Sequence, residues 1–212
     1  MYDERSYLQK FSMSQDISVE AEGDSPMETQ SELNQLVGSL SEQDYRQGSL
    51  NARVVLVEYG DYQCPQCGEL YALIKTIHRS LNGTFLEENY LCFVFRQFPQ
   101  PLIYPQAQKA AAAALATGAQ GQFWQMHDML FNHQQALENG YLVEYADRLG
   151  LNIPQFLQEM TRQMHIDRIN TDIESGLQSG VTTAPALFIN GIRYRDRWNI
   201  KQLMAAIITA SN

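Results

Sequence analysis

The sequence predicts an α/β fold in which a run of helices is inserted between two parts of one sheet. The apolar, β-branched run Val54–Val57 is typical of a strand that is buried on both faces. Two further apolar runs, Tyr90–Gln97 and Ala186–Ile189, have the length of strands. The long stretch between these two runs has helical periodicity instead, which indicates an α-helical insertion.

The first part of the sheet is expected to carry the chemistry. We expect its first main strand over Asn51–Tyr59, broken by Gly60 and Asp61. Apolar residues then recur at helical spacing from Cys64 to about Asn82, where an Asn-Gly pair is a helix stop signal. The strand Tyr90–Gln97 follows this helix.

The insertion is expected to contain several helices. They are predicted at Lys109–Thr117, Phe123–Phe131, Tyr141–Gly150, Pro154–Met160 and His165–Gln178. Gly180 ends the last of them, and the chain then returns to the sheet.

The C-terminal part completes the sheet. Asn190-Gly191 is a strong hairpin signal between the strand Ala186–Ile189 and a return strand over Ile192–Arg195. The closing helix is predicted over Trp198–Thr209.

Residues 1–43 are predicted to be an acidic, largely disordered extension, with short helices near Tyr7–Met13 and Ser31–Leu40. Residues 1–44 hold ten acidic and two basic side chains, so they carry −8 of the net charge of −9. The rest is nearly neutral and has no cluster of cations, which argues against nucleic acid as a partner. Because we found neither a secretory signal nor a run of about 18 apolar residues, we expect a cytoplasmic protein without a membrane span.

Two cysteines lie where a buried strand passes into a helix. Cys64 and Cys67 are separated by Pro65 and Gln66, and proline suits a first helical turn. Unpaired N–H groups at a helix N-terminus stabilise a thiolate, so we expect Cys64 to be the exposed, low-pKa nucleophile and Cys67 the buried resolving thiol. A zinc site or a structural pair is an alternative, but the only other cysteine is Cys92, read here as a buried strand residue.

Four blocks in the same order give this chain a family resemblance. They are EYGDYQCPQC, FRQFP at 95–99, GQFWQMHDMLF at 121–131 and GVTTAPALFING at 180–191. The chain resembles the DsbA-like branch of the thioredoxin superfamily, the thiol–disulfide oxidoreductases with an inserted helical domain. The resemblance implies a thioredoxin-like domain made of residues 44–103 and 180–212, with the helical domain at 104–179.

The resemblance also implies roles for single residues. Glu58, six residues before Cys64, matches the buried acid that assists proton transfer at the second cysteine. Burial would raise the pKa of this carboxyl group; the alternative is a half-exposed, salt-bridged glutamate. Pro185 matches the cis-proline that packs against the two cysteines, and Ala184 the residue before it, which binds the substrate backbone. Here alanine stands where the family often has Thr or Val.

We therefore expect thiol–disulfide exchange on protein or peptide thiols, with Pro65 and Gln66 tuning the redox pair. Strong oxidants of this family carry His where this chain has Gln66. The dithiol itself carries two electrons, so neither a cofactor nor a metal is expected, but an unidentified redox partner must recycle it. Two alternatives remain open: a redox-inactive thioredoxin-like binding module, and an isomerase or transferase acting on a small thiol conjugate.

Overall fold

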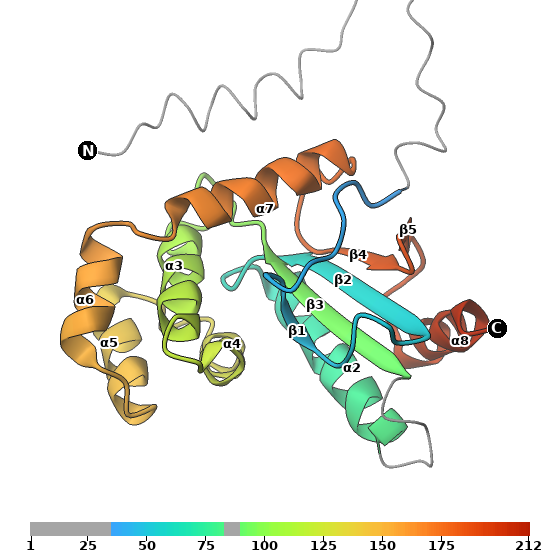
Figure 1. Cartoon of the computed structure of the whole chain (residues 1–212), viewed down its shortest axis with the longest axis horizontal. Coiled ribbons are helices and arrows are strands. Elements are labelled where there is room, and N and C mark those ends of the chain that lie inside the picture. The colour runs from blue at the N-terminus through green and yellow to red at the C-terminus, as the bar shows by residue number, and fades with distance from the viewer. Residues whose placement is uncertain (1–34, 83–89) are drawn as a thin grey trace, which may run out of the picture.

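Among the residues that the structure describes, the central sheet has five strands in the order β1-β3-β2-β4-β5 (Figure 1). The computed structural model describes residues 35–82 and 90–212. The strands are β1 Tyr45–Gln47, β2 Val54–Gly60, β3 Leu91–Gln97, β4 Ala186–Ile189 and β5 Ile192–Arg193. β2 and β3 are parallel, and all other neighbours are antiparallel.

Side chains of β2 alternate between two covered faces, which explains its unbroken apolar sequence. Tyr59 points towards helix α7 (Ile166–Gln178), where its hydroxyl lies 2.9 Å from Ser175 Oγ. Glu58 points to the opposite face, towards the two cysteines at the start of the next helix. That helix, α2 (Pro65–Asn82), packs beside the C-terminal helix α8 (Ile200–Ala210) (Figure 1).

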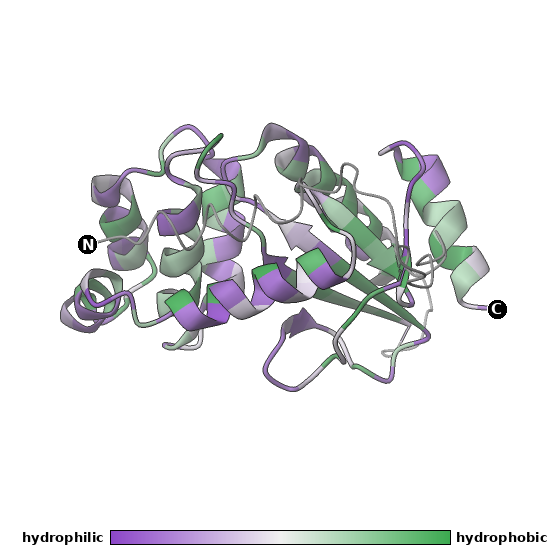
Figure 2. Cartoon of the chain, turned by 90° about the horizontal axis from the view of Figure 1, so that it is seen from above, coloured by the Kyte–Doolittle hydropathy of each residue, from purple (hydrophilic) through white to green (hydrophobic). Residues whose placement is uncertain are grey.

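The inserted segment folds into helices, as the sequence predicts. They are α3 Ala107–Gly118, α4 Phe123–Asn132, α5 Asn139–Arg148, α6 Ile153–Thr161 and α7 Ile166–Gln178. α3 to α6 lie beyond one end of the sheet, whereas α7 runs back along the sheet and contacts both β3 and α3 (Figure 1). Figure 2 shows polar and apolar residues alternating along α7, as expected for a helix with one buried side.

Several predicted boundaries move by a few residues. β2 begins at Val54 rather than Asn51, because a turn precedes it, with Ala52 N–H bonded to the Ser49 carbonyl at 2.9 Å. α8 begins at Ile200 rather than Trp198, because the Asn199 side chain caps it. The return strand β5 ends at Arg193 rather than Arg195.

The sequence does not predict β1, which has three half-buried residues and no apolar alternation. It does predict a helix over Ser31–Leu40, and this is wrong for residues 35–40, which are not helical. Instead Leu36 N–H donates to the Gly191 carbonyl at 2.8 Å, and Val37 N–H to Ser179 Oγ at 2.8 Å. The end of the predicted extension therefore lies against the body of the protein, while the helix expected at 7–13 is outside the described residues.

A buried ion pair fixes the start of β1 to β3. Arg96 Nε lies 3.0 Å from Asp44 Oδ1, and their side chains are 6% and 3% exposed. Burial opposes ionisation of Asp44, but the hydrogen bonds from Arg96 and from Ser41 N–H outweigh it, so its pKa is lowered. Within 35–82 and 90–212, no helix has both the length and the apolarity needed to cross a membrane.

Candidate functional site

The two cysteines lie at the start of α2, directly after the end of β2. Cys64 precedes the first residue of the helix, and Cys67 is in its first turn. Both thiols are free, and the residues are 1% and 0% exposed. The expectation that Cys64 is exposed is therefore wrong. Its Sγ is covered because Gln66 Oε1 lies at 3.3 Å and the Ala184 carbonyl oxygen at 3.6 Å.

The environment separates the acidities of the two thiols. A hydrogen bond from the Cys67 thiol is the main reason why the pKa of Cys64 is low. Burial acts in the opposite direction and raises this pKa. The hydroxyl of Tyr104 and backbone N–H groups also lower it, and the resulting pKa of Cys64 is about 6. Burial, together with the hydrogen bond to Cys64, raises the pKa of Cys67 well above its usual value. At neutral pH the pair can therefore hold a thiolate on Cys64 and a proton on Cys67.

The Ala184–Pro185 peptide bond is cis and precedes β4. Its loop lies against the dithiol, since the Cys64 thiol donates to the Ala184 carbonyl oxygen at 3.6 Å. The family resemblance implies such a contact, which joins segments 120 residues apart in the chain.

Glu58 is 1% exposed, and neither of its carboxylate oxygens has a hydrogen-bond partner among the described residues. Burial, and to a smaller extent the charge on Cys64, raises its pKa well above the usual value. In turn Glu58 contributes to the raised pKa of Cys67. The alternative of a half-exposed, salt-bridged glutamate is excluded by this burial.

The structure adds a second buried carboxyl group, Asp61, which the sequence analysis treated only as a strand breaker. It is 1% exposed, and burial raises its pKa to about 7 although backbone N–H groups of Gln63 and Gln100 donate to it, each at 2.8 Å. Its own N–H donates to Cys67 Sγ at 3.4 Å. Two titratable carboxyl groups therefore lie beside the dithiol.

The helical insertion also contacts the residues directly before α2. Gln134 Nε2 donates to the carbonyl oxygens of Tyr62 and Cys64, at 2.9 and 2.8 Å. Gly68 makes room for it, because a Cβ there would lie 2.3 Å from Gln134 Oε1. No local pattern in the sequence marks Gln134 or Tyr104, since each acts through a contact distant in the chain.

Two other residues singled out by their chemistry are packing residues. Cys92 is buried in β3, and burial raises its pKa to about 11, as expected for an inert thiol. His127 is buried in a cluster of aromatic rings, where burial lowers its pKa to about 3 and its Nδ1 lies 3.1 Å from the Tyr62 hydroxyl. No metal-binding cluster of His, Cys, Asp and Glu occurs in the described part of the chain.

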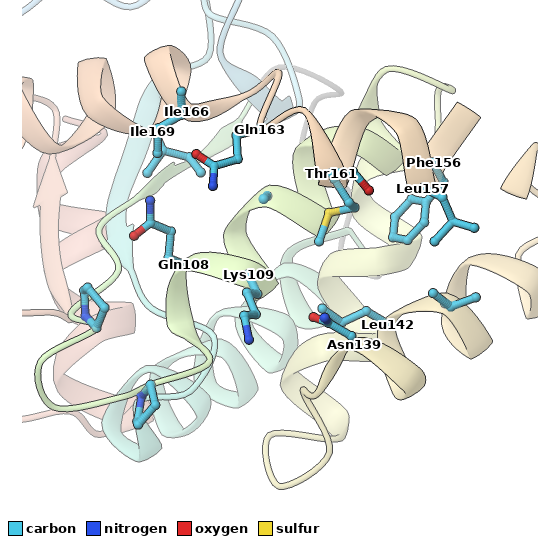
Figure 3. A pocket seen from close by; sticks show the side chains of 15 residues that line it. Gln108, Lys109, Asn139, Leu142, Phe156, Leu157, Thr161, Gln163, Ile166 and Ile169 are labelled. Atoms are coloured by element: carbon cyan, nitrogen blue, oxygen red, sulfur yellow. The ribbon is translucent and has the colours of Figure 1, made fainter. Parts of the chain in front are cut away.

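A separate cavity of about 490 Å³ lies between α3, α5, α6 and α7 (Figure 3). Most of its lining is apolar, and Lys109 is the one charged side chain among the described lining residues. Neither cysteine, nor Glu58, Ala184 or Pro185, is among its described lining residues. This cavity is therefore not part of the dithiol site.

Comparisons with known proteins agree with this arrangement. A family model described as "Thioredoxin" matches residues 40–208. The chain is 37% identical over 169 residues to a Na(+)/H(+) antiporter NhaA 1 of Salinispora arenicola, a match that covers 80% of this chain but only 25% of that protein. The chain thus spans about a quarter of the length of the curated relatives it matches.

Solved structures with a similar fold include proteins of thiol–disulfide exchange. A thioredoxin-like oxidoreductase from Silicibacter pomeroyi has a TM-score of 0.68 at 21% identity, covering 80% of this chain and 93% of that one. The thiol-disulfide exchange protein alpha-DsbA2 from Wolbachia pipientis has a TM-score of 0.66 at 18% identity, covering 78% and 86%. The chain therefore belongs to the thioredoxin family and has the fold of its DsbA-like members.

Proposed function

We propose that this protein is a thiol–disulfide oxidoreductase that exchanges disulfides with protein or peptide dithiols. The observation that carries the proposal is the geometry of two free thiols within one helical turn, with the loop of the cis Ala184–Pro185 bond against Cys64. This environment lowers the pKa of Cys64 to about 6 and raises the pKa of Cys67. A reactive thiolate paired with a protonated resolving thiol is the arrangement that sequential exchange requires.

The reduced protein would act in two steps. The Cys64 thiolate attacks one sulfur of a substrate disulfide, which forms a mixed disulfide and releases the other substrate sulfur as a thiolate. Glu58, in its ionised form, then takes the proton of Cys67. The resulting thiolate attacks Cys64 of the mixed disulfide and releases the second substrate sulfur, which takes up a proton and leaves as a thiol. Two electrons pass to the substrate, and the Cys64–Cys67 disulfide remains. The oxidised protein would run the same steps in reverse on a substrate dithiol.

Neighbouring residues would orient the substrate and tune the pair. We assign Ala184 and Pro185 to the substrate backbone, because their loop lies directly against Cys64. Pro65 and Gln66 occupy the first turn of α2. Gln66 Oε1 accepts a hydrogen bond from the Cys64 thiol at 3.3 Å, which favours the protonated form. We therefore expect this protein to have a redox potential below that of the strong oxidants of the family, because the Cys64 thiolate of its reduced state is stabilised less than theirs.

The proposed cycle needs a second redox protein or small thiol that returns the pair to its starting state. Its chemistry must be that of a dithiol or disulfide of matching potential, since the exchange balances only two electrons and two protons. We also propose a cytoplasmic location, in keeping with three cysteines of which two have catalytic spacing. Immunodetection of the protein in separated cell fractions tests this location.

Dithiol-dependent reduction of insulin tests the function. The wild-type protein should accelerate insulin precipitation, whereas Cys64→Ser should abolish the activity and Cys67→Ser should trap mixed disulfides through Cys64. Cys92→Ala is the matched control and should behave as the wild type. Absence of activity in the folded wild type would favour a redox-inactive binding module. Turnover of a glutathione conjugate that survives Cys67→Ser would favour a transferase or isomerase.

The same proteins give a direct test of the thiol assignment. Iodoacetamide at pH 6 should label Cys64 before Cys67 or Cys92, because only Cys64 is substantially ionised there. Mapping of the labelled peptide by mass spectrometry identifies the first thiol to react. Earlier labelling of either other cysteine would refute the assignment of the nucleophile.

A further inference from the structure

Gln100 connects the dithiol to the loop that contains the cis-proline. It follows β3 and is 5% exposed. Its side-chain Oε1 accepts hydrogen bonds from Ala184 N–H at 3.1 Å and from Thr183 Oγ1 at 3.3 Å. Gln100 therefore holds the two residues that precede the cis-proline.

The backbone of Gln100 is fixed to the dithiol side of the site. Its N–H donates to Asp61 Oδ2 at 2.8 Å, and its carbonyl oxygen accepts from Tyr104 N–H at 2.8 Å. Asp61 in turn donates its N–H to Cys67 Sγ at 3.4 Å and accepts at its carbonyl oxygen from Cys64 N–H at 3.2 Å. One buried residue thus joins three segments around the reactive sulfur.

The backbone of Ala184 is bonded on both sides. Its N–H donates to Gln100, and its carbonyl oxygen lies 3.6 Å from Cys64 Sγ. Gln100 Oε1 therefore fixes the Thr183–Ala184 peptide group, and through Ala184 it restricts the direction of the next peptide group, whose carbonyl oxygen faces the nucleophile. Displacement of a positioning group by about 1 Å can cost on the order of a hundredfold in rate, so this direction matters for any substrate held by the loop.

We propose that Gln100 is a positioning residue that aligns the Thr183–Pro185 loop with Cys64, so that polypeptide disulfides are presented correctly to the thiolate. This inference rests on the proposed function. It predicts a dependence on substrate type: a polypeptide uses the loop, whereas a small disulfide without a peptide backbone needs only the thiolate.

Two substitutions separate the side-chain acceptor from the rest of the residue. Gln100→Leu removes Oε1 but keeps the backbone bonds to Asp61 and Tyr104. Gln100→Glu keeps an acceptor oxygen in the same place. Gln122→Leu is the matched control, since it removes a side-chain hydrogen bond to the Leu149 carbonyl oxygen in the helical insertion, away from the dithiol and its loop. Thermal unfolding of all variants verifies that they are folded.

The reduced proteins are compared with insulin and with hydroxyethyl disulfide, which has no peptide group. Gln100→Leu should lower kcat/KM for insulin on the order of tenfold. Its rate with hydroxyethyl disulfide should stay within about twofold of the wild-type rate. Its redox potential should equal that of the wild type within the error of the measurement. Gln100→Glu and Gln122→Leu should retain most of the insulin activity. Equal losses on both substrates, or no loss on insulin, would overturn the proposal.

A readout without catalysis separates this inference from the proposed function. Hydrogen exchange of the Ala184 amide, followed by NMR, should be slow in the wild type and in Gln100→Glu and faster in Gln100→Leu. If the wild type reduces neither insulin nor hydroxyethyl disulfide, the proposed function fails. Hydrogen exchange of the Ala184 amide then still tests whether Gln100 holds the loop. Unchanged exchange of Ala184 in Gln100→Leu would refute the positioning role.

Discussion

Replacement of Glu58 by glutamine should make the stability of the protein less dependent on pH. Glu58 is 1% exposed, and neither carboxylate oxygen has a partner among the described residues. Glu58→Gln keeps the size and shape of the side chain but removes its charge. No described hydrogen bond is lost, so the effect should come almost entirely from the titration of the carboxyl group.

The sign follows from the raised pKa of Glu58, which burial causes. Above the ordinary glutamate pKa of about 4.3, an unfolded chain releases the proton that the folded protein still holds. The contribution of Glu58 to stability is therefore fully present below pH 4.3 and is lost as the pH rises through the raised pKa. Within this window the loss is about 1.4 kcal/mol per pH unit, the energy of one pKa unit.

The difference between the two proteins isolates this contribution. Asp61 and Asp172, whose pKa values burial raises to about 7 and about 6, also make stability fall with pH, but they are present in both proteins. The two free energies of unfolding should be similar at pH 4. The advantage of Glu58→Gln should then grow by about 1.4 kcal/mol for each pH unit until the pH exceeds the raised pKa.

Urea denaturation of the reduced proteins at pH 4, 5, 6, 7 and 8 measures these free energies. Glu69→Gln, which removes an exposed carboxylate from α2, is the matched control and should run parallel to the wild type. In single-turnover exchange between pH 6 and 8, Glu58→Gln should be slower, since Cys67 loses its proton acceptor. Parallel pH profiles of stability for wild type and Glu58→Gln would refute the raised pKa, and unchanged exchange rates would leave Glu58 without a role in proton transfer.

Three further changes have definite expected outcomes. Gln66→His should raise the redox potential by on the order of tens of millivolts, because an imidazole can donate a hydrogen bond to the Cys64 thiolate. Equilibration with a glutathione buffer at pH 7 measures this potential. A lower pKa of Cys64 with an unchanged redox potential would contradict the prediction. Asp44→Asn should cost about 3 kcal/mol in urea denaturation, because it leaves the buried guanidinium of its ion pair without a counter-charge; a loss below about 1 kcal/mol would show that the pair contributes little. Gln163→Gly should raise the free energy of unfolding by about 0.5–1 kcal/mol, since residue 163 has a φ of 50° in the turn after α6, and an unchanged thermal midpoint would contradict this.

Much of the fold could be predicted because its signals are local. The apolar run of β2, the Asn190-Gly191 turn and the alanine-rich α3 each report their own backbone conformation. The position of Cys64 and Cys67 at the start of a helix follows from the same kind of pattern. β1 could not be found, because a three-residue edge strand with half-buried side chains has no periodicity to detect.

The positions of the two sulfur atoms of the proposed chemistry follow from local patterns, because the strand, the break and the helix that place them are contiguous in the chain. How the sulfur of Cys64 is covered, and how the surrounding loops are joined, depends on the tertiary structure. The hydrogen bond from Ala184 to Gln100 spans 84 positions of the chain, and that from Cys64 to Ala184 spans 120. Such contacts depend on how the sheet and the inserted helices pack, and no local spacing of residues encodes them.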